Sequence, residues 1–175
     1  MVFLNQKVVY PGHGVAQVVK IFEKRISDNI ITLCELKFLN KGMTVMVSVD
    51  KFEDVGIRPL SSSEHISEVF TSFILPAKRL KDQEFYSSNW NRRNKDYQNK
   101  LKTGSLKSIS EVYLDLKSLS LQKELSFGEK NLLQKTEALL IEEISAIEAL
   151  DEVAAIERLR FFCGSSRVFA QRQLV

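Results

Sequence analysis

Apolar and polar positions alternate over much of the first sixty residues, and β-branched residues are dense there. Residues 43–49 show the alternation most clearly: Met43, Val45, Val47 and Val49 fall on one face of an extended strand, and Thr44, Met46 and Ser48 fall on the other. Such alternation is typical of half-buried antiparallel strands. The pattern predicts a small antiparallel β unit with strands at residues 7–10, 14–22, 30–38 and 43–49.

Turn residues separate these strands at short intervals. Pro11, Gly12 and Gly14 punctuate the first pair, residues 27–29 (Ser-Asp-Asn) have the composition of a hairpin tip, and residues 40–42 (Asn-Lys-Gly) suit the next reversal. These turns support the prediction of a small antiparallel β unit.

From Ser61 onward the apolar period changes from two to nearly four. Ile66, Val69, Phe70, Phe73 and Ile74 recur at helical spacing behind three serines that are able to cap a helix. Pro76 is expected to end that helix, and the polar, irregular residues 78–89 are predicted to link the β unit to a helical second half.

Three further helices are predicted, at residues 91–102, 105–117 or slightly beyond, and 127–161. Gly104 separates the first two, and Ser126 and Glu129 form a capping box at the start of the third. The end of the third is less defined, because its apolar positions suit either one long helix or a helical hairpin. A core stripe marks the second helix and comprises Leu106, Ile109, Val112, Tyr113, Leu116 and Leu119.

These elements predict an α+β protein with an all-α C-terminal half. We expect a β-rich domain at residues 1–60, a helix and linker at 61–88, a helical domain at 89–163 and a basic tail at 164–175. With 175 residues and 44% hydrophobic residues, the chain has enough apolar side chains to fill two small cores.

Composition excludes several classes of protein. No stretch approaches the roughly 20 apolar residues of a membrane span, and the N-terminus lacks the layout of a signal peptide, so we expect a cytoplasmic protein without membrane contact. Cys34 and Cys163 are too few and too far apart for a disulfide framework or a metal site, and both are expected to be reduced thiols.

Charge is unevenly distributed, although the net charge is only +3. Residues 76–135 carry 13 basic and 7 acidic residues, whereas residues 136–157 carry 7 acidic residues and no basic one. The middle of the chain therefore suits a polyanion and the next segment repels one. An ordinary solvated helix surface is the alternative explanation of the same charges.

No combination of residues indicates catalysis. The sequence has no glycine-rich phosphate loop and no metal-ligand spacing, and its two histidines, His13 and His65, lie in different elements. His13 suits a turn residue that caps backbone groups, and His65 suits a solvated helix position. A small hydrolase that uses His13 has no identifiable nucleophile with a positioned base, so we expect no enzyme, no cofactor and no metal.

The most informative cluster is residues 89–95, in which the single tryptophan, Trp90, precedes Arg92, Arg93 and Lys95. A flat apolar side chain can wedge into a distorted base step from the minor groove while neighbouring cations hold the phosphates. The alternative is that Trp90 is a core anchor of the helical half. Local sequence alone leaves both open.

Five blocks, in order, resemble the CarD/CdnL family of bacterial RNA polymerase-binding regulators over residues 1–150. They are residues 7–15 (KVVYPGHGV), 43–47 (MTVMV), 55–58 (VGIR), 89–93 (NWNRR) and 125–130 (LSFGEK). The resemblance implies a Tudor-like small antiparallel β barrel that docks on the β subunit of RNA polymerase, and a helical half that reaches promoter DNA.

The resemblance also implies roles for individual residues. Trp90 matches a tryptophan that wedges into the minor groove at the upstream edge of the transcription bubble, and Arg92, Arg93, Lys95 and Lys130 match basic residues along the DNA path. Lys24 and Met46 align with arginines that touch the polymerase in some members. Met46 has no charge, so docking is expected to use apolar contact and strand-edge pairing around Thr44, Met46 and Ser48, where Ser48 replaces a frequent proline.

The resemblance together with the residue pattern thus favours a regulator that binds RNA polymerase and promoter DNA together and stabilises the open complex. The resemblance also implies that it acts as a monomer on polymerase. The alternative is a polymerase or protein adaptor whose helices bind another protein, with Trp90 in the core.

Overall fold

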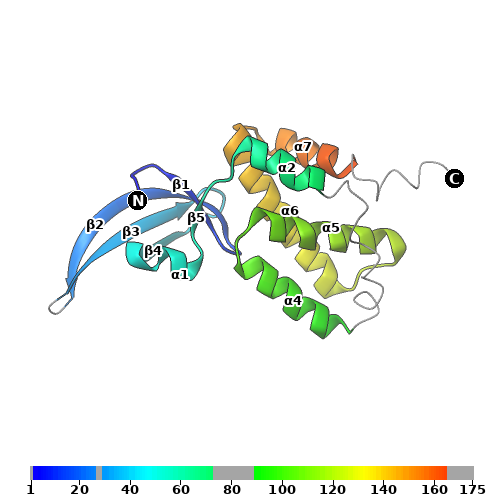
Figure 1. Ribbon diagram of the computed structural model, residues 1–175, viewed down its shortest axis with the longest axis horizontal. Helices are drawn as coiled ribbons and strands as arrows, with labels where there is room; N and C mark the ends of the chain where they lie inside the picture. The colour runs from blue at the N-terminus through cyan, green and yellow to red at the C-terminus, as the bar shows by residue number, and fades with distance from the viewer. Residues whose placement is uncertain (1, 27–28, 73–88, 165–175) are drawn as a thin grey trace.

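The computed structural model describes residues 2–26, 29–72 and 89–164. The β elements occupy one end of the molecule and most of the helices the other, so that the protein is elongated (Figure 1). The expected class, an antiparallel β domain followed by an all-α domain, is confirmed. The expected end of a helix at Pro76, the linker at 78–88 and nearly all of the basic tail lie outside the described residues.

Five strands form one antiparallel sheet in the order β4-β3-β2-β1-β5. The longest pair, β2 and β3, is a curved hairpin that projects away from the helices (Figure 1). Its register changes between Val18 and Lys20, where one extra residue bends β2. The strands are β1 (Lys7–Tyr10), β2 (Gly14–Ile26), β3 (Asn29–Phe38), β4 (Thr44–Ser48) and β5 (Arg58–Pro59).

One face of this sheet is the core of the β domain. Val18, Cys34 and Leu36 are fully buried there, together with Val47 from β4. The expected alternation in β4 is therefore confirmed, since Val47 faces the core and Met46 is 65% exposed. A 3₁₀ turn (Val49–Lys51) and the short helix α1 (Phe52–Val55) follow β4, and Phe52 closes the same core.

The remaining helices are α2 (Ser63–Ser72), α4 (Trp90–Lys102), α5 (Leu106–Gln122), α6 (Phe127–Glu148) and α7 (Glu152–Gly164). Of the two possibilities for the last predicted helix, the structure shows the hairpin, because α6 ends at Glu148 and α7 turns back onto it. Ala149 adopts the left-handed conformation with φ 52°, which ends a helix.

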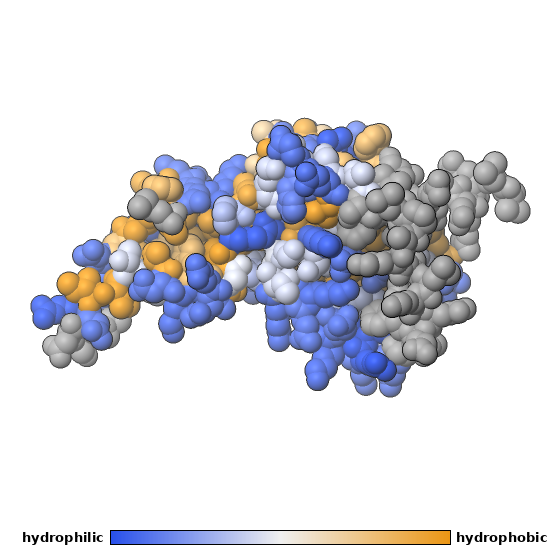
Figure 2. All heavy atoms as spheres, viewed as in Figure 1, coloured by the Kyte–Doolittle hydropathy of each residue, from blue (hydrophilic) through white to orange (hydrophobic). Residues whose placement is uncertain are grey.

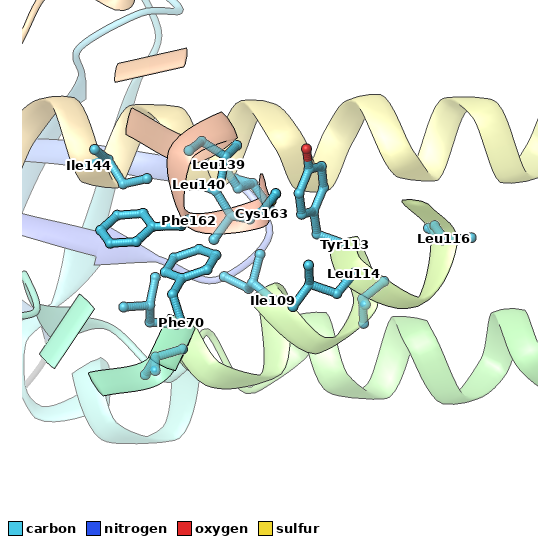
Figure 3. Packing of buried hydrophobic residues seen from close by; sticks show 14 of the residues in the cluster. Phe70, Ile109, Tyr113, Leu114, Leu116, Leu139, Leu140, Ile144, Phe162 and Cys163 are labelled. Atoms are coloured by element: carbon cyan, nitrogen blue, oxygen red, sulfur yellow. The ribbon is translucent and has the colours of Figure 1, made fainter. Parts of the chain in front are cut away.

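The helical domain has its own core, to which α2 contributes. Phe70 of α2 stacks on Phe162 of α7 with ring centroids 4.7 Å apart, and Tyr113 of α5 and Leu140 of α6 lie beside them (Figure 3). The segment that we grouped with the linker on sequence is therefore part of the helical core. Cys163 is a free, buried thiol in the same cluster, and burial raises its pKa to about 11.

A buried ion pair joins the two domains. Arg58 of β5 contacts Glu143 of α6 through both ends of its guanidinium group, with Nη1 to Oε1 at 2.7 Å and Nη2 to Oε2 at 2.8 Å. Arg58 Nε also donates to the carbonyl oxygen of Gly104 at 2.7 Å. The Glu143 side chain is 2% exposed and accepts further hydrogen bonds from the amide and hydroxyl of Ser61.

Close packing at Pro11 completes the junction between the domains. A Cβ atom on Gly104 would lie 2.9 Å from Pro11 Cγ, and Gly104 has φ 65°. Only glycine meets both conditions without strain. Because α6 also contacts β2, where the Val15 amide donates to Glu142, the two domains are held in one relative orientation.

Candidate nucleic-acid interface and docking surface

Helix α4 presents Trp90 at its first position. Asn89 is the N-cap residue, and its side-chain oxygen accepts a hydrogen bond from the Asn91 amide at 3.1 Å. This cap fixes the backbone at the start of the helix. Trp90 therefore projects from a rigid element and not from a loop.

The Trp90 side chain is half-buried. It packs against the helical core, and a Cβ atom on Gly128 would lie 3.0 Å from Trp90 Cζ2 and 3.3 Å from Nε1. The indole edge thus rests directly on the backbone at the start of α6, which the glycine permits. One side of the Trp90 ring packs in the protein and part of its surface is exposed to solvent. This position suits both a core anchor and a side chain that contacts DNA.

Arg93 departs from the expectation that it lines a DNA path. It is only 4% exposed, and its Nη2 contacts Glu129 Oε1 at 2.6 Å in a pair that is buried on both sides. Arg93, Tyr97 and Leu101 recur every four residues, so they share the helix face that points to the core. The structure thus places Arg93 inside the helical domain, where its ion pair holds α4 against α6, and not on the expected DNA path.

Glu129 serves two purposes. The expected capping box is confirmed, because the Ser126 hydroxyl accepts from the Glu129 amide and the Ser126 amide donates to Glu129 Oε2. The same carboxylate pairs with Arg93 and, at 3.3 Å, with Lys123. Burial acts to raise the pKa of Glu129, but hydrogen bonds from Ser126 and the charge of Lys123 outweigh it, so its pKa is lowered. The cap is evident in the local sequence, but the pairing of Glu129 with Arg93 is not.

Three of the expected basic residues are accessible. Arg92 and Lys95 are exposed on α4, and Lys130 is exposed on the first turns of α6, where its ammonium pairs with Glu124 at 2.9 Å. Among the described residues, the salt bridges found do not include Arg92 or Lys95. Hydrophilic residues cover the part of the surface that belongs to α4 (Figure 2).

The contact of Trp90 with Gly128 places the start of α4 beside the start of α6. Trp90, Arg92 and Lys95 from one helix and Lys130 from the other therefore lie at one end of the helical domain. The positive end of the α6 dipole lies there too and favours anions. This arrangement offers a partly exposed aromatic ring with flexible cations around it.

The residues expected to dock on polymerase share the outer face of the sheet. Met46 pairs across the strands with Glu35, and Glu35 pairs with Lys20. Ser48 pairs in the same way with Leu33, and Leu33 with Phe22. Cross-strand partners point to the same side of a sheet.

Thr44 and Lys24 belong to the same surface. Thr44 is two residues from Met46, and Lys24 is two residues from Phe22, so both follow the outer face. β4 is also an edge strand, with one side of its backbone unpaired by the sheet. Apolar residues gather over the far end of the β2-β3 hairpin (Figure 2).

His13 has the surroundings of a turn residue. Its Nδ1 lies 3.0 Å from the Pro11 carbonyl oxygen, and its amide donates to Tyr10. Within residues 2–26, 29–72 and 89–164, no cluster of three histidine, cysteine or acidic residues is arranged to hold a metal ion. In the same ranges, no helix combines the length and the apolar character that crossing a bilayer requires.

Two family models match this chain in sequence. The model described as the CarD-like/TRCF RID domain matches residues 4–61, and the model described as the CarD C-terminal domain matches residues 77–160. The chain belongs to the CarD/CdnL family. Members of the CarD-like family are non-enzymatic transcription factors. The RID domain indicates that this CarD-like chain is a transcription regulator that interacts with RNA polymerase.

The chain is also similar to individual known proteins. The chain is 27% identical over 156 residues to "Putative transcription factor YdeB" of Bacillus subtilis (strain 168), which covers 85% of this chain and 94% of that protein. It is also similar, at 29% identity, to the solution NMR structure of the 72-residue N-terminal domain of Myxococcus xanthus CarD. That match covers 34% of this chain and 79% of the other, with a TM-score of 0.30.

Proposed function

We propose that this CarD-like chain binds the β subunit of RNA polymerase with its β domain and promoter DNA with its helical domain. DNA contact is at the upstream edge of the transcription bubble, and the consequence is a more stable open complex. The chain acts in the cytoplasm as a monomer on polymerase. The observation that carries the DNA part of the proposal is the position of Trp90, half-exposed at the capped start of α4 with Arg92 and Lys95 close by in the same helix.

The stabilisation needs no chemistry. A ligand shifts an equilibrium only by its difference in affinity for the two states. The exposed part of the Trp90 ring has more apolar base surface to contact at a melted junction than on closed duplex, while Arg92, Lys95 and Lys130 neutralise flanking phosphates in either state. The difference in affinity therefore comes from the ring, and the cations supply general affinity.

Docking on polymerase is assigned to the outer face of β2, β3 and β4. Met46 supplies apolar area, Lys24 a charge farther along the hairpin, and the edge of β4 around Thr44 and Ser48 supplies backbone groups for strand pairing. The ion pair of Arg58 with Glu143 fixes this face relative to Trp90, so both partners are engaged in one geometry.

The test is the lifetime of open complexes formed by the cognate polymerase on a weak promoter. The protein should extend the lifetime, and Trp90→Ala should shorten it again at any protein concentration. Arg92→Glu should shorten it at protein concentrations that no longer saturate the promoter, because this variant loses general affinity for DNA. Arg92→Glu is the cleaner variant because Arg92 is exposed, whereas loss of the half-buried indole costs about 2 kcal/mol of stability. Lys107→Glu is the matched control, since Lys107 is exposed at the start of α5, beyond the far end of α4.

Polymerase binding is tested separately with Met46→Asp in a pull-down without DNA. Val153 is 68% exposed on α7, nearly the same as Met46, so Val153→Asp controls for a new surface charge. Equal binding by the two variants contradicts docking through the outer face. No extension of the lifetime by the wild-type protein contradicts stabilisation of the open complex.

The packing of Trp90 on Gly128 favours one alternative, a protein adaptor in which Trp90 is only an anchor of the core. In that case lifetimes are extended equally by the wild-type protein and by Arg92→Glu, and forked DNA is bound no better than duplex.

A further inference from the structure

Phe127 is the most exposed large apolar side chain in the described part of the chain, at 81%. It is the first residue of α6, between the cap residue Ser126 and Gly128, on which Trp90 rests. A single exposed apolar side chain is common on protein surfaces, but an exposed aromatic ring beside a candidate DNA site offers a surface on which a base can stack.

The fold does not account for this ring. Capping of α6 is performed by Ser126 and Glu129, and the preceding Leu125, which is 6% exposed, makes the apolar contact at this turn. Since helix positions repeat every 3.6 residues, Phe127 points away from the buried side of α6, where Glu129 and Leu132 lie. Its removal is therefore expected to leave the stability of the domain unchanged.

The surroundings of Phe127 are those of the candidate DNA surface. Lys130 is three residues farther along α6 and shares its solvent face, although its ammonium also pairs with the exposed Glu124. The indole of Trp90 lies against the neighbouring Gly128. Lys123 is also nearby in sequence, although its charge is partly occupied by Glu129. Cations around an exposed aromatic ring, at the positive end of a helix, favour a polyanion with flat apolar faces over an apolar protein groove.

We propose that Phe127 stacks on an unpaired base at the upstream junction, next to the site of Trp90. This inference rests on the proposed function and deepens it, because it assigns the recognition of the melted strand to a second aromatic residue. Trp90 is held by the protein along one edge, so the ring of Phe127 offers the more accessible face of the two. Every base has a flat face that can stack, so Phe127 should add affinity for melted DNA of any sequence.

The experiment compares the affinity of the full chain for forked and for duplex DNA. The forked DNA carries 2-aminopurine as its first unpaired base, whose fluorescence is quenched on stacking. Phe127→Ala should weaken binding to the fork on the order of tenfold and abolish the quenching, while duplex binding changes little. Phe127→Tyr retains the ring and should behave like the wild type.

The matched control is Phe161→Ala, because Phe161 is 63% exposed on α7 and should not affect either DNA. A Phe127→Ala variant that binds the fork like the wild type, while Trp90→Ala does not, overturns this inference and leaves the proposed function standing. If neither variant affects binding to the fork, both are overturned. Loss of polymerase binding by Phe127→Ala in the absence of DNA would place the ring on protein and also refute the inference.

Discussion

Replacement of Arg58 by methionine should destabilise the whole chain, because it leaves the Glu143 carboxylate buried without its cation. Glu143 is 2% exposed and would keep only the hydrogen bonds from Ser61, and the carbonyl of Gly104 would lose its donor. Methionine fills a similar length of side chain, so the change removes charge and hydrogen bonds more than volume.

The magnitude can be worked from the geometry. Two unit charges about 4 Å apart attract by about 4 kcal/mol at an effective dielectric of about 20. Loss of one partner of a buried pair costs about 3 to 5 kcal/mol, and the Gly104 hydrogen bond adds about 1 kcal/mol. Arg58 is 24% exposed, so water at its position reduces the penalty. We expect a loss of about 4 kcal/mol, a large part of the stability of about 5 to 15 kcal/mol of a typical domain.

Urea unfolding measures this loss with two probes. Far-UV circular dichroism follows both domains, and fluorescence of Trp90, the single tryptophan, follows the helical domain. Because Arg58 joins the domains, the two transitions should coincide in the wild type and separate in Arg58→Met. The double variant Arg58→Met/Glu143→Leu should recover much of the loss, since no charge is then left buried.

The control is Lys100→Met, which breaks the ion pair with Glu111. Both of these side chains are about one-third exposed, so the expected cost is below about 1 kcal/mol. If Arg58→Met costs no more than Lys100→Met, or if the double variant is as unstable as the sum of its two single variants, the ion pair does not join the domains as we infer.

Two further predictions concern the ends of α6. The pKa of Glu129 is lowered in the folded state, so its contribution to stability is present above the unfolded value of about 4.3 and is lost as the pH falls through the folded value. The stability gap between the wild type and Glu129→Gln in urea unfolding should therefore shrink between pH 7 and about pH 3, and a constant gap contradicts this. At the other end, Ala149→Gly should raise the free energy of unfolding by about 0.5 to 1 kcal/mol. The left-handed backbone conformation strains alanine, and relief of this strain outweighs the greater freedom of glycine in the unfolded chain. A lower urea midpoint for the variant would refute this.

Local sequence patterns predicted the elements well where a residue spacing is typical of a single structure, such as the alternation of a strand or the capping box of a helix. The period-two alternation at Thr44, Met46 and Ser48 identified the outer face of β4, and the Ser126-Glu129 spacing identified the first residue of α6. The residues expected to dock on polymerase fall on one face for the same reason, since cross-strand pairing is set directly by the register.

The fate of Arg93 shows where local patterns stop. Arg92, Arg93 and Lys95 look alike in sequence, yet of these three only Arg93 points toward the core, and its partner Glu129 lies 36 residues away. No local signal marks such a pair, because its formation depends on how α4 packs against α6. The place of Trp90, half in the protein and half in solvent, was undecided for the same reason, since it depends on the approach that Gly128 permits.

The sequence by itself determined the fold class, the order of β1 to β4 and of α2, α4, α5 and α6, the capping of α6 and the family, because these depend on periodicity, turn chemistry and short ordered motifs. It did not predict the short elements α1 and β5, and it left the separation of α7 from α6 open. Tertiary structure decided which polar residues are buried, how α2 joins the helical core and how Arg58 joins the domains. Those features arise from contacts between residues far apart along the chain, and such contacts depend on the packing of whole elements, which no local pattern contains.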